Sequence, residues 1–176
     1  CGIVGDRLTS PYIISSRFNR LMPQRRLLIV AHAPSENTKK LRDAVVDGAQ
    51  SPDIQGVEVV CRNPFEAVPE DVLAAQAIIL GTTENLGYMS GALKDFFDRI
   101  YYPCLEQSEG LPYAVYIRAG HDGTGTRRGI ETIVTGLRWR SVQEPVICQG
   151  DWDDGFVPRC EELGAGMAAG LEIGIF

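Results

Sequence analysis

Small polar side chains gather at two places where an apolar run of the sequence ends. The first is the segment 32–38, which follows the apolar run 27–31 and contains Ser35, Asn37 and Thr38. Where such a segment enters a helix, unpaired backbone N–H groups carry partial positive charge and suit a phosphate, and the three side chains could add donors. The alternative is that Ser35 or Asn37 only caps the helix.

The second place is the segment 81–91, GTTENLGYMSG, which follows the apolar run 77–80. The glycines of this segment allow backbone conformations that other residues rarely adopt. The segment also contains amide and hydroxyl side chains, a tyrosine and a methionine. Such a loop can wrap a flat polar heterocycle, with Leu86, Tyr88 or Met89 covering the apolar faces. The competing interpretation is an ordinary turn that ends with Ser90 as a helix cap.

A third loop, residues 118–125, contains three glycines that allow close approach of the backbone, but their spacing is not that of a dinucleotide fingerprint. His121 could assist a proton transfer because its reference pKa is about 6.5, although a loop histidine is more often only solvated. Asp122 is expected to cap or turn the loop.

The elements that must position these loops alternate along the chain. Strands are expected at 27–31, 57–61, 77–80, 113–117 and 142–148. Helices are expected at 37–49, 90–100, 130–137 and 160–171, and a short helix or a turn at 71–76. Alternation predicts a five-stranded parallel sheet with helices on both faces, and ligands bind such sheets at the carboxyl ends of the strands. Pro145 places the fifth strand at the edge.

Composition bounds the function. The 176 residues are 44% hydrophobic, which fits one core, and we expect a domain at 27–176 behind an N-terminal extension at 1–26. The net charge of −6 disfavours nucleic acid. Cysteine spacing and the acidic turn 151–155 indicate no metal site. Apolar runs are too short for membrane insertion, and we expect a cytoplasmic protein.

The segment 81–99, GTTENLGYMSGALKDFFDR, resembles the flavin loop and following helix of flavodoxin-like NAD(P)H-dependent FMN reductases and quinone reductases. The resemblance implies a flavodoxin-like three-layer sandwich with strand order 2-1-3-4-5. It also implies that FMN is held by these residues: Ser35, Glu36, Asn37 and Thr38 at the phosphate, and Thr82, Thr83, Glu84, Asn85, Leu86, Gly87, Tyr88 and Met89 at the ring and ribityl chain. In related proteins the loop corresponding to 118–125 reaches the exposed side of the flavin ring, so the resemblance also implies ring contacts at Ala119 and Gly120. Glu36 and Pro34 depart from the family pattern. The family usually has a small residue in the place of Glu36, and Pro34 removes one donor N–H.

The function implied is an FMN-dependent oxidoreductase that takes hydride from NAD(P)H and reduces a quinone or a similar small molecule. One alternative is a flavodoxin-type electron carrier without a nicotinamide site, and another is an interaction domain that keeps the fold without FMN. Related reductases often build the pocket between subunits, so the resemblance implies a homodimer or a homotetramer. The aromatic helix with Phe96, Phe97, Tyr101 and Tyr102 could form such an interface.

Overall fold

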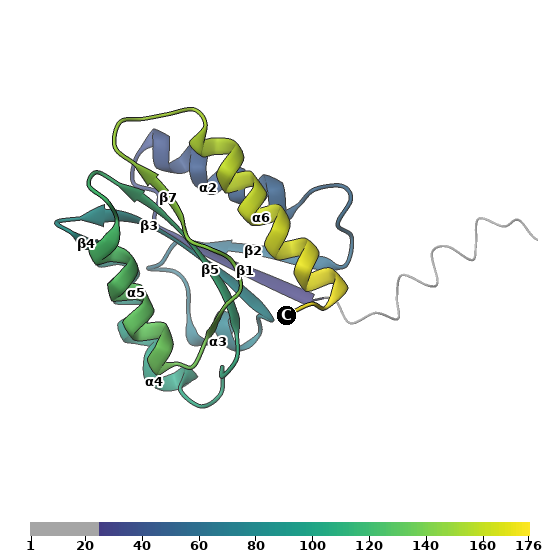
Figure 1. Ribbon diagram of the computed structural model, residues 1–176. Helices are drawn as coiled ribbons and strands as arrows, with labels where there is room; N and C mark the ends of the chain where they lie inside the picture. The colour runs from purple at the N-terminus through teal and green to yellow at the C-terminus, as the bar shows by residue number, and fades with distance from the viewer. Residues whose placement is uncertain (1–24) are drawn as a thin grey trace, which may run out of the picture.

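Residues 25–176 are described by a computed structural model, in which a seven-stranded sheet lies between two layers of helices (Figure 1). The strands are β1 Arg25–Ala31, β2 Val57–Arg62, β3 Ala77–Asn85, β4 Tyr88–Met89, β5 Pro112–Ala119, β6 Arg140–Ser141 and β7 Val146–Gln149. The helices are α2 Glu36–Ala49, α3 Pro69–Leu73, α4 Gly91–Cys104, α5 Thr124–Gly136 and α6 Phe156–Ile173. None of these helices is both long and apolar enough to cross a bilayer.

The predicted N-terminal extension lies outside the described residues up to position 24. Its last two residues, Arg25 and Arg26, belong to β1, which therefore begins two residues earlier than predicted. The guanidinium of Arg25 donates to the carbonyl of Leu171 in α6, and Arg26 pairs with Glu58 of the neighbouring strand at 2.9 Å. Both arginines thus contribute to the edge of the core.

The order of the strands is β2-β1-β3-β5-β6, and β7 continues beside β5 where β6 stops. All of these pairs are parallel, so the predicted order of a flavodoxin-like sheet is confirmed. β1 and the first half of β3 are buried because helices cover both faces of the sheet. Continuous apolar runs are typical of strands in this situation.

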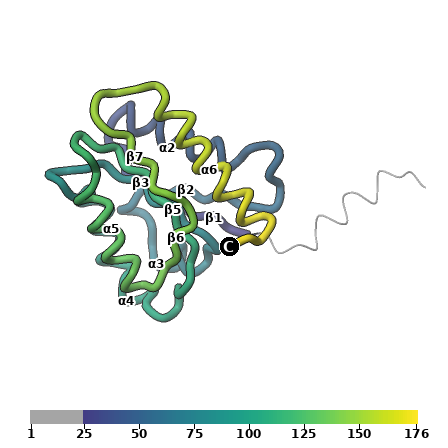
Figure 2. The backbone as a smooth tube through the Cα atoms, in the orientation of Figure 1, coloured from purple at the N-terminus to yellow at the C-terminus, as the bar shows by residue number. Residues whose placement is uncertain are grey.

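Two hydrophobic cores flank the sheet, one under each of the helix layers whose backbone is traced in Figure 2. Alternation along β1 sends Leu28 and Val30 to the core under α4 and α5, and Leu27 and Ile29 to the core under α2 and α6. Helices therefore pack against both faces of the sheet. This packing fixes the positions at which the strands end.

The fifth predicted strand, 142–148, is interrupted in the structure. β6 ends at Ser141 and β7 begins at Val146, so Pro145 lies in the break between them. Proline has no N–H to donate and is excluded from a continuous ladder. The two short strands pair with β5 alone among the described strands, which agrees with the predicted edge position.

The segment 81–89, for which the sequence predicts a loop, forms a β-hairpin. β3 continues to Asn85 and turns back into β4, with Glu84 opposite Met89 and Asn85 opposite Tyr88. The two turn residues, Leu86 and Gly87, have φ values of 54° and 75°. Two left-handed residues in sequence match the twist of a tight hairpin.

The aromatic residues of α4 do not form the exposed face that an interface would require. Phe96 and Phe97 are buried in the core, which contradicts their predicted place at a subunit contact. Tyr101 is half-buried and packs against the same core, whereas Tyr102 is exposed. The helix uses its apolar stripe to cover the sheet, and the oligomeric state stays a prediction.

Helices α2 and α6 approach each other closely through two glycines. A Cβ atom on Gly48 would lie 2.0 Å from the backbone oxygen of Glu161, and one on Gly164 would lie 2.0 Å from that of Val45. Backbone atoms cannot give way as a side chain does, so these positions require glycine. The contact fixes α2, whose N-terminus follows the first polar loop.

We predict that Gly164→Ala lowers the free energy of unfolding by about 1–3 kcal/mol, because its methyl group would force the two helices apart. Gly166→Ala, in the same helix, is the matched control. Its Cβ would meet only the end of the flexible Gln143 side chain, and alanine favours a helix by up to about 1 kcal/mol. Chemical denaturation measures both variants, and equal stabilities would contradict the close-contact account.

Candidate functional site

Three polar loops meet at the carboxyl edge of the sheet. They follow β1, β3 and β5, and the ladder places Ala31 beside Gly81 and Gly81 beside Tyr116 at this edge. The strand order reverses between β1 and β3, because the chain leaves β1 for β2 on one side and returns to β3 on the other. Ligands of open α/β sheets bind outside such a reversal.

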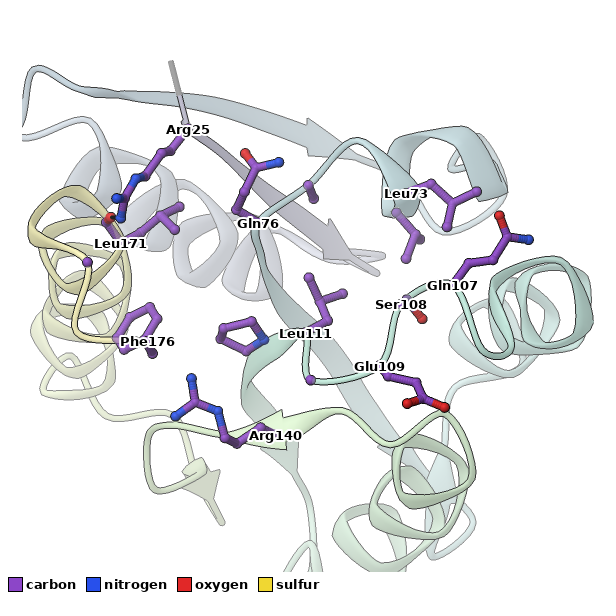
Figure 3. Close-up of a pocket in the computed structure, with 15 residues that line it drawn as sticks. Arg25, Leu73, Gln76, Gln107, Ser108, Glu109, Leu111, Arg140, Leu171 and Phe176 are labelled. Atoms are coloured by element: carbon purple, nitrogen blue, oxygen red, sulfur yellow. Dashed lines mark hydrogen bonds between the residues drawn. The ribbon is translucent and has the colours of Figure 1, made fainter. Parts of the chain in front are cut away.

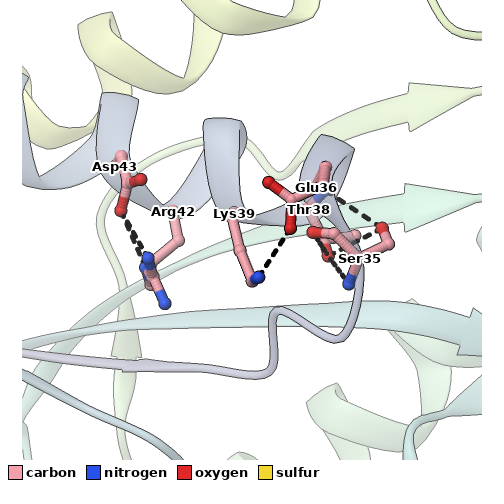
Figure 4. A network of polar contacts seen from close by, with 6 residues as sticks. All are labelled: Ser35, Glu36, Thr38, Lys39, Arg42 and Asp43. Atoms are coloured by element: carbon pink, nitrogen blue, oxygen red, sulfur yellow. Dashed lines mark hydrogen bonds and ion pairs between the residues drawn. The ribbon is translucent and has the colours of Figure 1, made fainter.

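The first loop ends in a capping box at the start of α2 (Figure 4). The hydroxyl of Ser35 accepts the N–H of Thr38 at 3.3 Å, and the hydroxyl of Thr38 accepts the N–H of Ser35 at 2.8 Å. The capping interpretation therefore describes these two side chains. The N–H groups of Glu36 and Asn37 belong to the first turn, where no intrahelical acceptor exists, so backbone donors still face the loop.

The negative charge of Glu36 points away from the N-terminal turn of α2. Its exposed carboxylate pairs with Lys39 at 2.6 Å and lies along the outer surface of α2 (Figure 4). The hydrogen bond and the charge of Lys39 lower the pKa of Glu36. The departure from the family pattern thus leaves the helix N-terminus open to an anion.

The hairpin is closed at its base by a buried hydroxyl pair. Thr82 Oγ1 accepts the N–H of Ser90 at 3.1 Å and donates to the carbonyl of Thr83 at 3.0 Å. Ser90 Oγ in turn accepts the N–H of Leu93 at 3.2 Å and caps α4, as the competing interpretation predicted. The side chain of Thr82 therefore holds the hairpin and does not face a ligand.

The other predicted side chains of the hairpin point in different directions. Met89 is buried in the core, and Tyr88 lies against the backbone of Gly129 in α5. Asn85 and Leu86 are exposed at the tip. Of the side chains predicted to cover a ring, only that of Leu86 is free of packing partners, so most contacts to a ring would come from backbone atoms.

Four buried side-chain polar atoms have no hydrogen-bond partner among the described residues, and two of them belong to the first two loops. These two are Nδ1 of His32, after β1, and Oγ1 of Thr83, near the end of β3. Burial lowers the pKa of His32, which favours its neutral form. Buried polar atoms normally have hydrogen-bond partners. These two atoms therefore fit a polar ligand at this edge, such as the FMN that the sequence resemblance implies.

Tyr116 is a site feature that the sequence analysis missed. Its ring passes over Gly81, where an added Cβ would lie 2.2 Å from the ring, so the glycine makes room for it. The hydroxyl is buried beneath the carboxyl edge without a partner among residues 25–176, and burial raises its pKa well above the ordinary value. The signal available in the sequence was Gly81, a glycine directly after the apolar run 77–80.

The third loop is anchored to the sheet by Arg118 and is exposed at Gly120. Arg118 donates to the carbonyls of Ala119 and Cys148 at 2.7 and 3.0 Å and thereby joins the ends of β5 and β7. Ala119 is buried, whereas a Cβ on Gly120 would meet no atom within 4 Å. The backbone of Gly120 is thus accessible to a ligand, as its predicted ring contact requires.

His121 and Asp122 follow at the exposed end of this loop. Asp122 Oδ1 accepts the N–H of Thr124 at 2.9 Å, which confirms its predicted turn role, and this hydrogen bond lowers the pKa of Asp122. The backbone N–H of His121 is bound by Glu84, and the residue is exposed. A catalytic role for the His121 imidazole stays a hypothesis.

The acidic turn 151–155 is ordered by its own side chains. Trp152 Nε1 donates to Asp154 at 2.8 Å, and Asp153 accepts the N–H of Gly155 at 2.7 Å. The Trp152 ring also lies under the ammonium of Lys40 in α2, 5.5 Å from the centroid. Residues 25–176 contain no cluster of side chains that could ligate a metal ion.

A cavity of about 550 Å³ lies at the opposite, amino edge of the sheet (Figure 3). Its walls include Arg25 and Gln76, next to the starts of β1 and β3, and Arg140 at the start of β6. The sequence analysis did not anticipate it. We nevertheless assign the candidate site to the carboxyl edge, because within residues 25–176 the open N-terminus of α2 and the strand reversal lie at that edge.

The chain is similar in sequence to two proteins with known names. No family model matches the chain. It is 30% identical over 112 residues to a protein named flavodoxin from Aquifex aeolicus, covering 64% of this chain and 60% of that protein. It is 33% identical over 95 residues to an NAD(P)H dehydrogenase (quinone) from Archaeoglobus fulgidus, covering 42% and 50%. The chain thus spans about half to three fifths of these relatives.

Solved structures give the same fold at lower identity. An archaeal flavodoxin superposes with a TM-score of 0.70 at 18% identity, covering 83% of this chain and 98% of the other. A WrbA-like flavodoxin from Agrobacterium tumefaciens superposes with a TM-score of 0.62 at 15% identity, covering 84% and 96%. The strand order and these similarities show that the chain has the flavodoxin-like fold.

Proposed function

We propose that the protein is an FMN-binding oxidoreductase that uses NAD(P)H to reduce a quinone or a similar small molecule. The observation that carries the proposal is the meeting of three polar loops at the strand reversal, with open N–H groups at the start of α2. The unpartnered buried atoms of His32 and Thr83 support a polar ligand at the same edge.

The binding roles divide between the loops. The N–H groups of Glu36 and Asn37, with the side chain of Asn37, would hold the FMN phosphate, whereas the hydroxyl of Ser35 is occupied by the capping box. The backbone of the hairpin at 83–88 and the backbone of Ala119 and Gly120 would hold the ring. Bound FMN supplies the redox chemistry, so no nucleophile or acid–base pair is required of the protein.

The proposed reaction is the oxidation of NAD(P)H by a quinone, in which two electrons and two protons convert the quinone to a hydroquinone and release NAD(P)⁺. The second proton comes from solvent. The exposed hairpin tip and Gly120 leave one face of the site open, so both substrates could use it in turn. The similarity to the Archaeoglobus NAD(P)H dehydrogenase (quinone) supports this choice.

The second candidate is a flavodoxin-type electron carrier. The similarity to the Aquifex flavodoxin favours it, since that match covers more of the chain than the dehydrogenase match. A carrier binds FMN with the same loops but needs no nicotinamide site. Reduction of the bound flavin by a nicotinamide nucleotide therefore separates the two candidates.

We predict that Asn37→Asp weakens FMN binding by about tenfold or more and leaves riboflavin binding within about twofold. Riboflavin lacks the phosphate, so only FMN would meet the added negative charge at the helix N-terminus. Fluorescence titration of both flavins measures the two dissociation constants. Gln50→Glu at the other end of α2 carries the same charge change about 20 Å away and should change neither.

Equal losses for FMN and riboflavin in Asn37→Asp would mean that the residue does not lie at the phosphate. Thr38 is a poor choice for this test, because its hydroxyl belongs to the capping box. Replacing it would cost about 1 kcal/mol of helix stability whatever the ligand.

We predict that the FMN-loaded protein, followed anaerobically by its visible absorbance, is bleached by NADH or NADPH within seconds and recovers its colour on addition of a quinone. Substrate access to the open face is the physical reason. Colour lost only with dithionite would favour the electron carrier. Failure to bind FMN at all would overturn both candidates and leave an interaction domain with this fold.

A further inference from the structure

Glu84 joins the two loops that are proposed to hold the flavin ring. Its carboxylate accepts the backbone N–H of His121 at 2.7 Å through Oε2 and that of Gly123 at 3.2 Å through Oε1. Hydrogen bonds to an ionised acceptor are stronger than neutral ones. The single side chain thus binds both ends of the turn 121–123, while its own strand lies in the hairpin.

The ladder explains why Glu84 reaches this position. The pairing of β3 with β5 ends at Thr83 and Arg118, one residue before Glu84. Beyond that point β5 bends away into the third loop, and Glu84 is the first hairpin residue that can bridge the gap. Gly123, the N-cap of α5, has a φ of 71° and no side chain of its own to cap the helix. The Glu84 carboxylate also places negative charge near this N-terminus, where it is favourable.

The rest of the hairpin is packed against the same helix. A Cβ on Gly125 would lie 2.0 Å from the carbonyl oxygen of Gly87, and one on Gly129 would lie 2.5 Å from the Tyr88 ring. These contacts leave no room for the hairpin to shift toward α5. The hairpin, the third loop and the first turns of α5 therefore form one unit, with Glu84 as its polar connection.

We infer that Glu84 is a positioning residue for the flavin ring, which acts through the N–H groups of His121 and Gly123 rather than by touching the ring. By fixing the turn, it sets the direction in which the backbone of Ala119 and Gly120 faces the site. The inference rests on the proposed function, in which the ring lies between the hairpin and this loop. It replaces the predicted direct contact of Glu84 with FMN.

The test compares Glu84→Ala and Glu84→Gln with Glu131→Gln, a control that removes the same charge from the exposed face of α5. In the flavin-free protein, amide hydrogen exchange at His121 and Gly123 should become about tenfold faster in Glu84→Ala. Glutamine has nearly the same shape and keeps one acceptor oxygen, so Glu84→Gln should fold and show an intermediate rate. Unchanged exchange in both variants would overturn the inference.

The second measurement is flavin affinity. Glu84→Ala should weaken FMN and riboflavin by the same factor of about ten, because the ring side is altered and the phosphate side is not. Glu84→Gln should restore part of the affinity, and Glu131→Gln should match the unaltered protein. Faster amide exchange with unaltered flavin affinity would overturn the positioning role alone. If the unaltered protein binds no flavin, the proposed function fails and this role fails with it.

Discussion

Strand polarity in a parallel sheet is the constraint on which the rest of the structure depends. Because β1, β3 and β5 run in one direction, their carboxyl ends meet at one edge, and three loops that are distant in sequence become neighbours. The helix layers make this arrangement rigid. The glycine contact between α2 and α6 fixes the helix whose N-terminus faces the first loop.

Each of the three loops takes its shape from short-range interactions of its own. The first is shaped by the capping box of Ser35 and Thr38, the second by the buried pair of Thr82 and Ser90, and the third by the arginine at position 118. These groups are occupied with the protein itself. What remains for a ligand is mostly backbone, together with the unpartnered atoms of His32 and Thr83.

The sequence was sufficient to predict a parallel sheet between two helix layers from its alternating apolar runs, and its resemblance to flavodoxin-like reductases implied the strand order. It was insufficient where a residue's role depends on a distant partner. Glu84 is a hairpin residue by position, yet its partners are 37 and 39 residues away. Phe96 and Phe97 have the pattern of a surface stripe and of a core stripe alike, and only packing against the sheet distinguishes the two. Pro145 indicated an edge strand, but not that the strand would be divided.

The most direct test of the central claim is a titration of the ¹⁵N-labelled protein with FMN, followed by the shifts of its backbone amide signals. The account predicts that the largest shifts fall on residues 35–38, 82–89 and 118–123. Shifts concentrated instead at the amino edge, around Gln76, Gly110 and Arg140, would place the ligand in the cavity at that edge and contradict the account.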